Sequence, residues 1–188
     1  MSTLSQKLKR KLLQLAFGFD KWHISPLQER PYAIDIIRYC NDQPIRNSFC
    51  EIGCGLGDII RNVHYTSRKG YDLDRKVLKA AAVLRVSGGG AISYQVFQFP
   101  DTLLEDKVNV LAMVNWIHHI EPLVLQQKLG EYFQQNILPG GRIIIDTVQD
   151  PAYKHNHKIE FLTKGLNCSL YRIGEYARQR EVWSIQKP

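Results

Sequence analysis

The stretch Glu51-Ile52-Gly53-Cys54-Gly55-Leu56-Gly57-Asp58 decides how this chain is interpreted. An acidic residue lies near the end of a short apolar run, and three glycines follow at every second position. Glycine is needed where the chain takes a positive φ or where a ligand lies against bare backbone. The stretch therefore predicts a strand over residues 48–52, a tight glycine loop, and a helix over residues 58–66. This is the arrangement that holds a nucleotide at a helix N-terminus.

The glycine spacing separates two kinds of nucleotide site. A dinucleotide fold uses G-x-G-x-x-G, whereas this chain has G-x-G-x-G with the carboxylate of Glu51 two residues before the first glycine. A negative charge there would repel a pyrophosphate, but it suits a ligand that carries an ammonium and a sulfonium. The stretch resembles motif I of the class I S-adenosylmethionine-dependent methyltransferases, written E/D-x-G-x-G-x-G, at all of its positions. The resemblance implies the cofactor S-adenosyl-L-methionine, with a first group of binding residues at Glu51, Gly53, Cys54, Gly55 and Gly57.

The resemblance covers about residues 45–188 and implies an α/β fold. The expected architecture is a three-layer αβα sandwich with a doubly wound, mostly parallel seven-stranded sheet and a reversed C-terminal hairpin strand. Periodicity predicts the other elements at matching places. They are helices over residues 4–17, 27–40, 75–86, 122–135 and part of 153–166, and strands over 69–74, 91–99, 108–114, 143–146, 168–173 and 181–186, with a turn near Gly174 joining the last two.

The spacing between two acidic residues predicts a second part of the cofactor site. Asp72 comes 21 residues after Glu51, about one helix and one strand later. Because parallel strands end at the same edge of a sheet, the two carboxylates should lie side by side, within reach of ribose hydroxyls. Asp72 matches the acidic post-motif of the family, and Leu73 beside it joins the cofactor set. Asp74 is the expected N-cap of the helix that follows.

The third and fourth strands supply the remaining cofactor candidates. The family often places an acid after the third strand, where it binds the adenine amino group, but this chain has Gln98 and Phe99 there. The carbonyl of Gln98 can accept that hydrogen bond and Phe99 can stack, while Asp101 is the alternative acceptor. Asn115, just after the fourth strand, completes the set.

Two histidines follow Asn115 and are the candidate catalytic residues. Methyl transfer is an in-line displacement, so the protein mainly aligns the reacting atoms. A hydroxyl or ammonium acceptor must also lose a proton, and histidine is the natural base. His118 and His119 are both candidates, although the second histidine of such a turn is often structural in relatives. Asn115-x-x-His118-His119 loosely resembles the E-x-x-E-H metal cluster of plant-type small-RNA 2′-O-methyltransferases, which His155 and His157 could complete. Both glutamates of that cluster are missing, so we predict no metal.

Residues 1–44 are expected to form a helical lid or flap outside the main domain. In the family, a segment before the first strand often folds over the cofactor. Candidates for contacting cofactor or substrate are Trp22, His23, Arg30 and Tyr32, with core packing as the alternative for Trp22 and Tyr32.

The first helix of this segment, over residues 4–17, carries leucines on one face and a basic first half. The favoured interpretation is a solvated flap packed on the domain. A membrane surface and nucleic acid are the alternatives.

Composition limits the class of protein. At 188 residues, one domain with a full core is expected, and residues 45–188 form it. No apolar run is long enough to cross a bilayer, and the four cysteines form no C-x-x-C pair, so reduced thiols and a cytoplasmic location are expected. The net charge of +7 leans toward anionic partners.

The predicted activity is methyl transfer to a hydroxyl or amine of a small, possibly anionic or sugar-like acceptor. RNA methylation and a catalytically idle cofactor-binding module are the alternatives, and the glycine spacing disfavours a nucleotide-dependent oxidoreductase. No DNA substrate is expected, because the chain has neither an Asn/Asp-Pro-Pro-Tyr/Phe motif after the fourth strand nor a Pro-Cys dipeptide.

Overall fold

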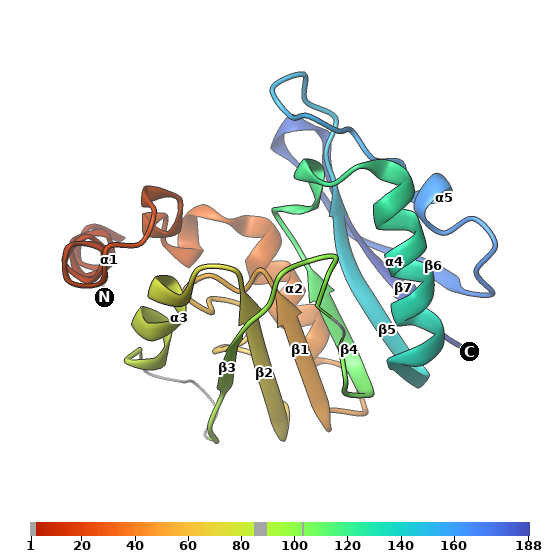
Figure 1. Ribbon diagram of the computed structural model, residues 1–188, viewed down its shortest axis with the longest axis horizontal. Helices are drawn as coiled ribbons and strands as arrows, with labels where there is room; N and C mark the ends of the chain where they lie inside the picture. The colour runs from red at the N-terminus through yellow and green to blue at the C-terminus, as the bar shows by residue number, and fades with distance from the viewer. Residues whose placement is uncertain (1–2, 85–89, 103) are drawn as a thin grey trace.

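The computed structural model describes residues 3–84, 90–102 and 104–188, and its centre is a single sheet. The strands are β1 (Ser48–Ile52), β2 (Ser67–Asp72), β3 (Ser93–Val96), β4 (Val108–Met113), β5 (Ile137–Thr147), β6 (Ser169–Tyr176) and β7 (Arg180–Gln186). They form a seven-stranded sheet in the order β3-β2-β1-β4-β5-β7-β6 (Figure 1). The first five strands are mutually parallel, and β7 is antiparallel to both β5 and β6. The predicted doubly wound sheet with a reversed C-terminal hairpin is therefore confirmed.

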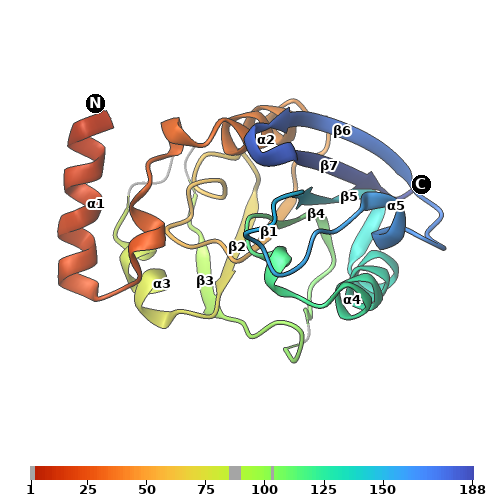
Figure 2. The same ribbon diagram turned by 90° about the horizontal axis from the view of Figure 1, so that it is seen from above.

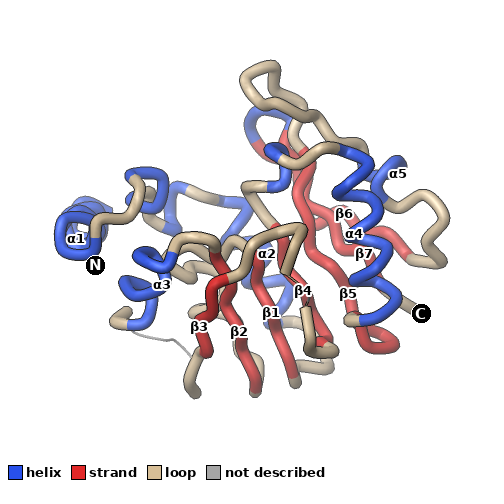
Figure 3. The backbone as a smooth tube through the Cα atoms, in the orientation of Figure 1, coloured by secondary structure: helices blue, strands red, loops and turns tan. Residues whose placement is uncertain are grey.

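Helices cover both faces of the sheet, as Figures 2 and 3 show. The α-helices are α1 (Thr3–Phe17), α2 (Pro31–Asn41), α3 (Arg75–Ala82), α4 (Pro122–Gln135) and α5 (Ile159–Leu162), and the short 3-10 helices are η1 (Lys21–Ile24), η2 (Leu27–Glu29), η3 (Ile117–His119) and η4 (Ala177–Gln179). One buried cluster joins α4 and α5 to the sheet, and a second joins α2 and the segment after the glycine loop to its other face. The three predicted layers are present.

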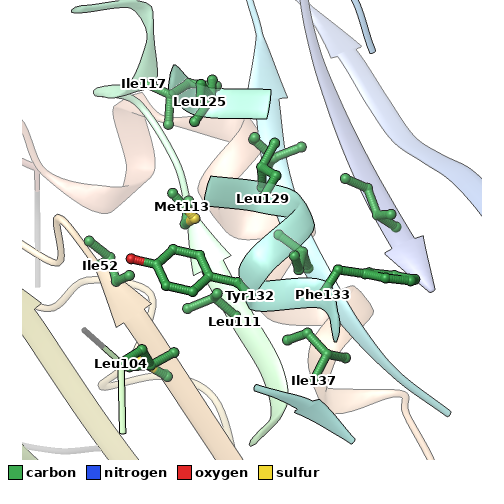
Figure 4. Packing of buried hydrophobic residues seen from close by; sticks show 14 of the residues in the cluster. Ile52, Leu104, Leu111, Met113, Ile117, Leu125, Leu129, Tyr132, Phe133 and Ile137 are labelled. Carbon is green, nitrogen blue, oxygen red and sulfur yellow. The ribbon is translucent and has the colours of Figure 1, made fainter. Parts of the chain in front are cut away.

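The larger core lies between α4 and the sheet (Figure 4). Leu125 and Leu129 of α4 are fully buried against strand residues such as Leu111 and Met113. Every residue of β4 is buried. This is expected for a parallel strand covered on both faces, which has no solvent side and so reads as a continuous apolar run.

The helix predicted over residues 58–66 is wrong, because that segment forms a series of turns instead. In a helix over these residues, the N–H of Asn62 would bind the carbonyl of Asp58. Here the Asn62 N–H donates to the Ile59 carbonyl at 2.9 Å, and the Asn62 side chain takes the Asp58 carbonyl at 2.7 Å. Arg61 and Val63 still donate helical bonds to Gly57 and Ile59, at 2.9 and 3.2 Å. A side chain thus interrupts the backbone ladder that helical spacing predicted.

Other boundaries also differ from the prediction, since β2 ends at Asp72 instead of Asp74 and β3 is shorter than the strand predicted over 91–99. β5 begins at Ile137 and contains the Pro-Gly-Gly turn as a bulge, because Gly140 takes a φ of +73° and the register against β4 shifts there. The C-terminal hairpin turns at η4 rather than near Gly174, and Arg178 takes a φ of +62° in that turn. The predicted helix over 27–40 is divided into η2 and α2 just before Pro31. The end of the helix predicted over 75–86 falls on residues outside the described ranges.

The N-terminal helix α1 packs on the domain, but not through the face that the sequence suggested. The residues turned toward the domain are Arg10, Leu13 and Phe17, which lie beside α3 and the glycine loop. The four leucines of the predicted packing face, Leu4, Leu8, Leu12 and Leu15, are exposed. Among the described residues, no helix is both long and apolar enough to cross a membrane.

Candidate functional site

The glycine loop lies between the carboxyl ends of β1 and β2. Gly53 and Gly55 have φ angles of +77° and +53°, a region that other residues adopt only with strain. The N–H groups of Gly53 and Cys54 donate to the carbonyl of Tyr71 at 2.8 and 2.9 Å. The loop is therefore fastened to the end of the neighbouring strand and presents bare backbone at the carboxyl edge of the sheet.

Asp72 joins the loop from the end of β2. Its Oδ2 atom accepts a hydrogen bond from the Gly55 N–H at 2.8 Å, and its Oδ1 atom accepts one from the Asp74 N–H at 3.0 Å. Asp74 in turn accepts from Lys76 N at 2.7 Å and caps α3, as predicted. Each oxygen of the half-buried Asp72 carboxylate keeps a second lone pair. The structure thus places Asp72 beside the glycine loop, where the strand order required it.

Glu51 lies behind the loop rather than on its open face. Its side chain is buried, and Oε2 accepts the N–H of Ile60 at 3.0 Å. Burial raises the pKa of Glu51 to about 8, with a further increase from the charges of Asp58 and Asp72. Glu51 therefore holds the turn that follows the loop, and the expected charge repulsion toward a pyrophosphate does not come from this residue. Cys54 is also buried, with its Sγ 3.7 Å from the Gly55 carbonyl.

Two aromatic side chains cover the loop. A Cβ on Gly53 would fall 2.3 Å from Cδ1 of Trp116, and one on Gly55 would fall 2.6 Å from Nδ1 of His23. Trp116 is held there by a hydrogen bond of 2.7 Å from its Nε1 to the Ile52 carbonyl. Burial lowers the pKa of His23, against the opposing charges of Asp72 and Asp74. Only glycine at these two positions allows both rings to approach so closely.

Of the four lid residues predicted in the segment before β1, only some lie near the glycine loop. His23 is the predicted lid residue that reaches the loop, whereas Trp22 is exposed and neither packs in the core nor covers the loop. Arg30 forms an ion pair with Asp58. Tyr32 lies under the guanidinium of Arg180, whose Cζ is 4.7 Å from the ring centroid. The side chains of Arg30 and Tyr32 also contact each other, and the charge of Arg30 acts on His23, so these three predicted lid residues lie close together and Trp22 lies apart.

Asp58, at the end of the glycine stretch, binds three arginines that the sequence did not connect to it. They are Arg10 of α1, Arg30, and Arg61 in the next turn. Burial by itself would raise the pKa of Asp58, but hydrogen bonding to Arg10 and the nearby positive charges lower it to about 2. This cluster ties the N-terminal segment to the glycine loop.

A second buried ion pair positions Asn115. Asp146 near the end of β5 pairs with Arg180 of β7, and its Oδ1 atom accepts the Asn115 N–H at 2.8 Å. Asn115 is exposed and takes a φ of +72°, a left-handed conformation that asparagine tolerates better than most residues. Sequence analysis missed Asp146 and Arg180, because their partners lie on strands far apart in the chain.

The two candidate bases have different surroundings. His118 is buried, and its ring packs 3.9 Å from Tyr153 and 4.4 Å from His119 between centroids. Burial, followed by the charges of His119, Arg180 and His157, lowers the pKa of His118 to about 4. His119 is exposed on η3, directly after the residues that cover the loop. His118 therefore stays neutral at pH 7, and only His119 is open to solvent.

The later histidines, His155 and His157, contact the same turn. His157 is buried, with Nε2 3.0 Å from the Ile117 carbonyl, and His155 donates its N–H to the His118 carbonyl at 3.1 Å. Within the described part of the chain, no group of three or more His, Cys, Asp or Glu side chains could hold a metal ion.

The predicted adenine contacts lie on the loop after β3. The amide of Gln98 donates to Asp101 at 3.2 Å, so these two alternative acceptors contact each other. Phe99 packs edge-on against Trp116, with the ring centroids 5.1 Å apart. Leu73, next to Asp72, is exposed at the same edge. Asp72 thus meets the loop at Gly55, while Phe99 contacts Trp116, which covers the loop at Gly53.

Comparison with solved structures identifies the fold. The N-methyltransferase NodS from Bradyrhizobium japonicum WM9, in complex with S-adenosyl-L-homocysteine, superimposes with a TM-score of 0.73 at 14% identity, over 95% of this chain and 98% of that chain. The chain has the class I methyltransferase fold. Two further methyltransferases with this fold, both solved with S-adenosylmethionine bound, match at TM-scores of 0.69 and 0.64.

The first of these is the magnesium protoporphyrin IX methyltransferase ChlM from Synechocystis PCC 6803, at 13% identity over 91% of this chain and 86% of that chain. The second is an amino pentose methyltransferase from Micromonospora echinaspora, at 8% identity over 93% and 94%. No protein-family model and no curated protein sequence matches the chain. The class I methyltransferase fold is therefore established by structure alone.

Proposed function

We propose that this protein is an S-adenosylmethionine-dependent methyltransferase. The observation that carries the proposal is the contact between Gly55 and Asp72, which sets a carboxylate against the glycine loop at the carboxyl ends of β1 and β2. This is where a nucleoside binds in a doubly wound sheet. Solved structures of the same fold contain S-adenosylmethionine or S-adenosyl-L-homocysteine, which agrees with this proposal.

The residues at the loop fit this cofactor better than a dinucleotide. A pyrophosphate needs free backbone N–H groups, but the Gly55 N–H already donates to the Asp72 carboxylate. A second negative group would therefore meet both an occupied donor and a like charge. The spare lone pairs of Asp72 suit ribose hydroxyls, while Leu73 and Phe99 offer apolar surface for adenine and Gln98 a polar contact. Asn115, which is exposed after β4, would receive the amino acid end.

For methyl transfer, the protein must align the acceptor with the methyl group and remove a proton from the acceptor. When bound, S-adenosylmethionine supplies a methyl carbon activated by its sulfonium. The chain must then orient the acceptor and take one proton from its hydroxyl or ammonium. We assign this proton transfer to His119, which is exposed beside the cover of the loop. Protonating His118 would place a charge in a buried site among other positive groups, so His118 is better suited to supporting the turn.

A small molecule is the favoured acceptor. The amino pentose methyltransferase and the N-methyltransferase NodS share this fold over nearly their whole length, and the described chain adds no recognition domain to it. The net charge of +7 favours an anionic compound. Methylation of RNA, and a cofactor-binding module without turnover, are the alternatives.

Two measurements test the proposal. Calorimetry with S-adenosylmethionine, S-adenosyl-L-homocysteine and NAD should give binding of the first two only. Tight binding of NAD without a response to the sulfonium compound would contradict it. Transfer of a labelled methyl group to pooled hydroxyl- and amine-bearing metabolites, compared with RNA, then distinguishes an enzyme from an idle module. Binding with no transfer to either pool would favour the module.

A further inference from the structure

Helix α1 has two apolar faces, and one of them has no partner in the described structure. The inner face packs on the domain through Leu13 and Phe17, which contact the cluster around Leu56 and Val77. On the outer face the side chains are between 60% and 78% exposed, and they are Leu4, Leu8, Leu12 and Leu15. Spacings of four, four and three residues place these leucines in one stripe along the helix.

The position of α1 is fixed, so this exposure is not that of a loose terminus. Arg10 projects from the inner face, pairs with Asp58 beside the glycine loop, and donates to the Ser25 carbonyl at 2.9 Å. Figure 2 shows α1 along the outer flank of the molecule, beside α3 and away from the sheet. With its inner face anchored in this way, the helix presents the leucine stripe to solvent.

The leucine stripe is framed by positive charge. Lys7, Lys9 and Lys11 are exposed on α1, with Lys7 paired to Glu29. The neighbouring helix α3 adds the exposed Arg75, Lys76 and Lys79, and neither helix contains an acidic residue. Trp22, on the adjoining η1, is also exposed.

We propose that the outer face of α1 binds an anionic phospholipid surface. Leucines that enter the boundary between headgroups and acyl chains, lysines that reach the headgroups, and an aromatic ring at the interface are the features of an amphipathic helix lying in the membrane plane. A second copy of the chain fits poorly, because pairing two such helices would bring lysines against lysines without an acid between them. Nucleic acid would satisfy the lysines but would leave the leucine stripe in water.

The test is flotation of the purified full-length protein with lipid vesicles. Binding is expected to vesicles that contain phosphatidylglycerol, to be much weaker with phosphatidylcholine alone, and to fall at high salt. Leu8→Glu/Leu12→Glu should reduce the partition onto anionic vesicles about tenfold or more, because it places charge where apolar side chains would insert. Lys9→Gln/Lys11→Gln should also reduce it about tenfold or more, through the lost attraction of two lysines.

Matched controls separate this surface from general effects. Leu123→Glu changes a leucine of α4 that is 63% exposed, and it should bind vesicles like the unchanged protein. Thermal unfolding should be the same in all variants, since the changed side chains are exposed. Vesicle binding that the leucine substitutions leave intact would overturn the proposal. So would a concentration-dependent dimer, seen by sedimentation, that Leu8→Glu/Leu12→Glu abolishes. None of these readouts depends on methyl transfer.

Discussion

The backbone N–H of Gly55 and the carboxylate of Asp72 are joined by a hydrogen bond of 2.8 Å, which links the glycine loop to the end of β2. The same carboxylate accepts the Asp74 N–H and so also orders the start of α3. Asp72 is thus part of the framework of the loop as well as the proposed ribose ligand. A substitution there has two separable effects, one on binding and one on stability.

Asp72→Ala should weaken binding of S-adenosyl-L-homocysteine by about ten- to a few hundredfold, the value of hydrogen bonds to a charged group. It should also lower the free energy of unfolding by about 1–3 kcal/mol, because the N–H groups of Gly55 and Asp74 lose their acceptor. An unpaired pocket carboxylate could be lost at little cost to the fold, but the two hydrogen bonds of Asp72 make it part of the framework. Calorimetry and urea unfolding measure the two effects.

The control for Asp72 is Glu160→Ala, which removes an exposed carboxylate of α5. It should leave both quantities nearly unchanged. If Asp72→Ala lowered stability while the affinity stayed the same, Asp72 would be a structural residue only.

Glu51 should make the ligand-free protein less stable as the pH rises. Its pKa is about 8 in the folded protein, against an ordinary value of 4.5, so the folded state holds a proton that the unfolded chain releases between these values. Stability from this group is therefore greatest below pH 4.5 and declines up to about pH 8. Glu51→Gln keeps an acceptor for the Ile60 N–H but has no proton to lose. Its stability relative to the unchanged protein should rise across this window by at least about 1.4 kcal/mol, the equivalent of one pKa unit.

Urea unfolding at pH 5 and pH 8 measures this difference, with Glu160→Gln on the surface of α5 as the control for removing a carboxylate. A constant difference between Glu51→Gln and the unchanged protein at both pH values would show that Glu51 is ionised throughout.

His119→Ala should reduce turnover by about a hundredfold or more, the usual contribution of a positioned base. Its thermal stability and its affinity for cofactor should be unchanged, because the ring is exposed. His118→Ala is the matched variant and should instead lower the melting temperature, since its ring packs between Tyr153 and His119. A large loss of turnover in stable His118→Ala, with full activity in His119→Ala, would reverse the assignment.

Gly53→Ala should destabilise the protein more than Gly140→Ala. Both glycines have φ near +75°, so alanine costs about 1–2 kcal/mol at either position through backbone strain alone. A Cβ at Gly140 meets open space, whereas one at Gly53 falls 2.3 Å from Trp116. Displacing that ring should add about 1–3 kcal/mol and shift its fluorescence. Equal costs at the two positions would mean that Trp116 does not cover the loop.

The sequence by itself determined the parts of this protein that depend on local rules. The apolar run before Gly53 forms a strand with the predicted bounds, and Asp74 caps α3 as predicted. The spacing of Glu51 and Asp72 correctly placed these two acids on neighbouring parallel strands. The seven-stranded sheet with its reversed hairpin was predicted from the resemblance to the methyltransferase family that the glycine stretch carries.

Only the tertiary structure decided which partners the polar side chains found. Asp58 binds Arg10 and Arg30, and Asp146 binds Arg180, across chain separations that no periodicity records. After the loop, the side chain of Asn62 took the Asp58 carbonyl that a helix would have given to the Asn62 N–H, and the segment forms turns instead of a helix. The exposure of the leucines of α1 could likewise not be predicted from the sequence. Helical spacing fixes which residues share a face, but the anchoring of Arg10 beside the glycine loop determines which face is turned to solvent.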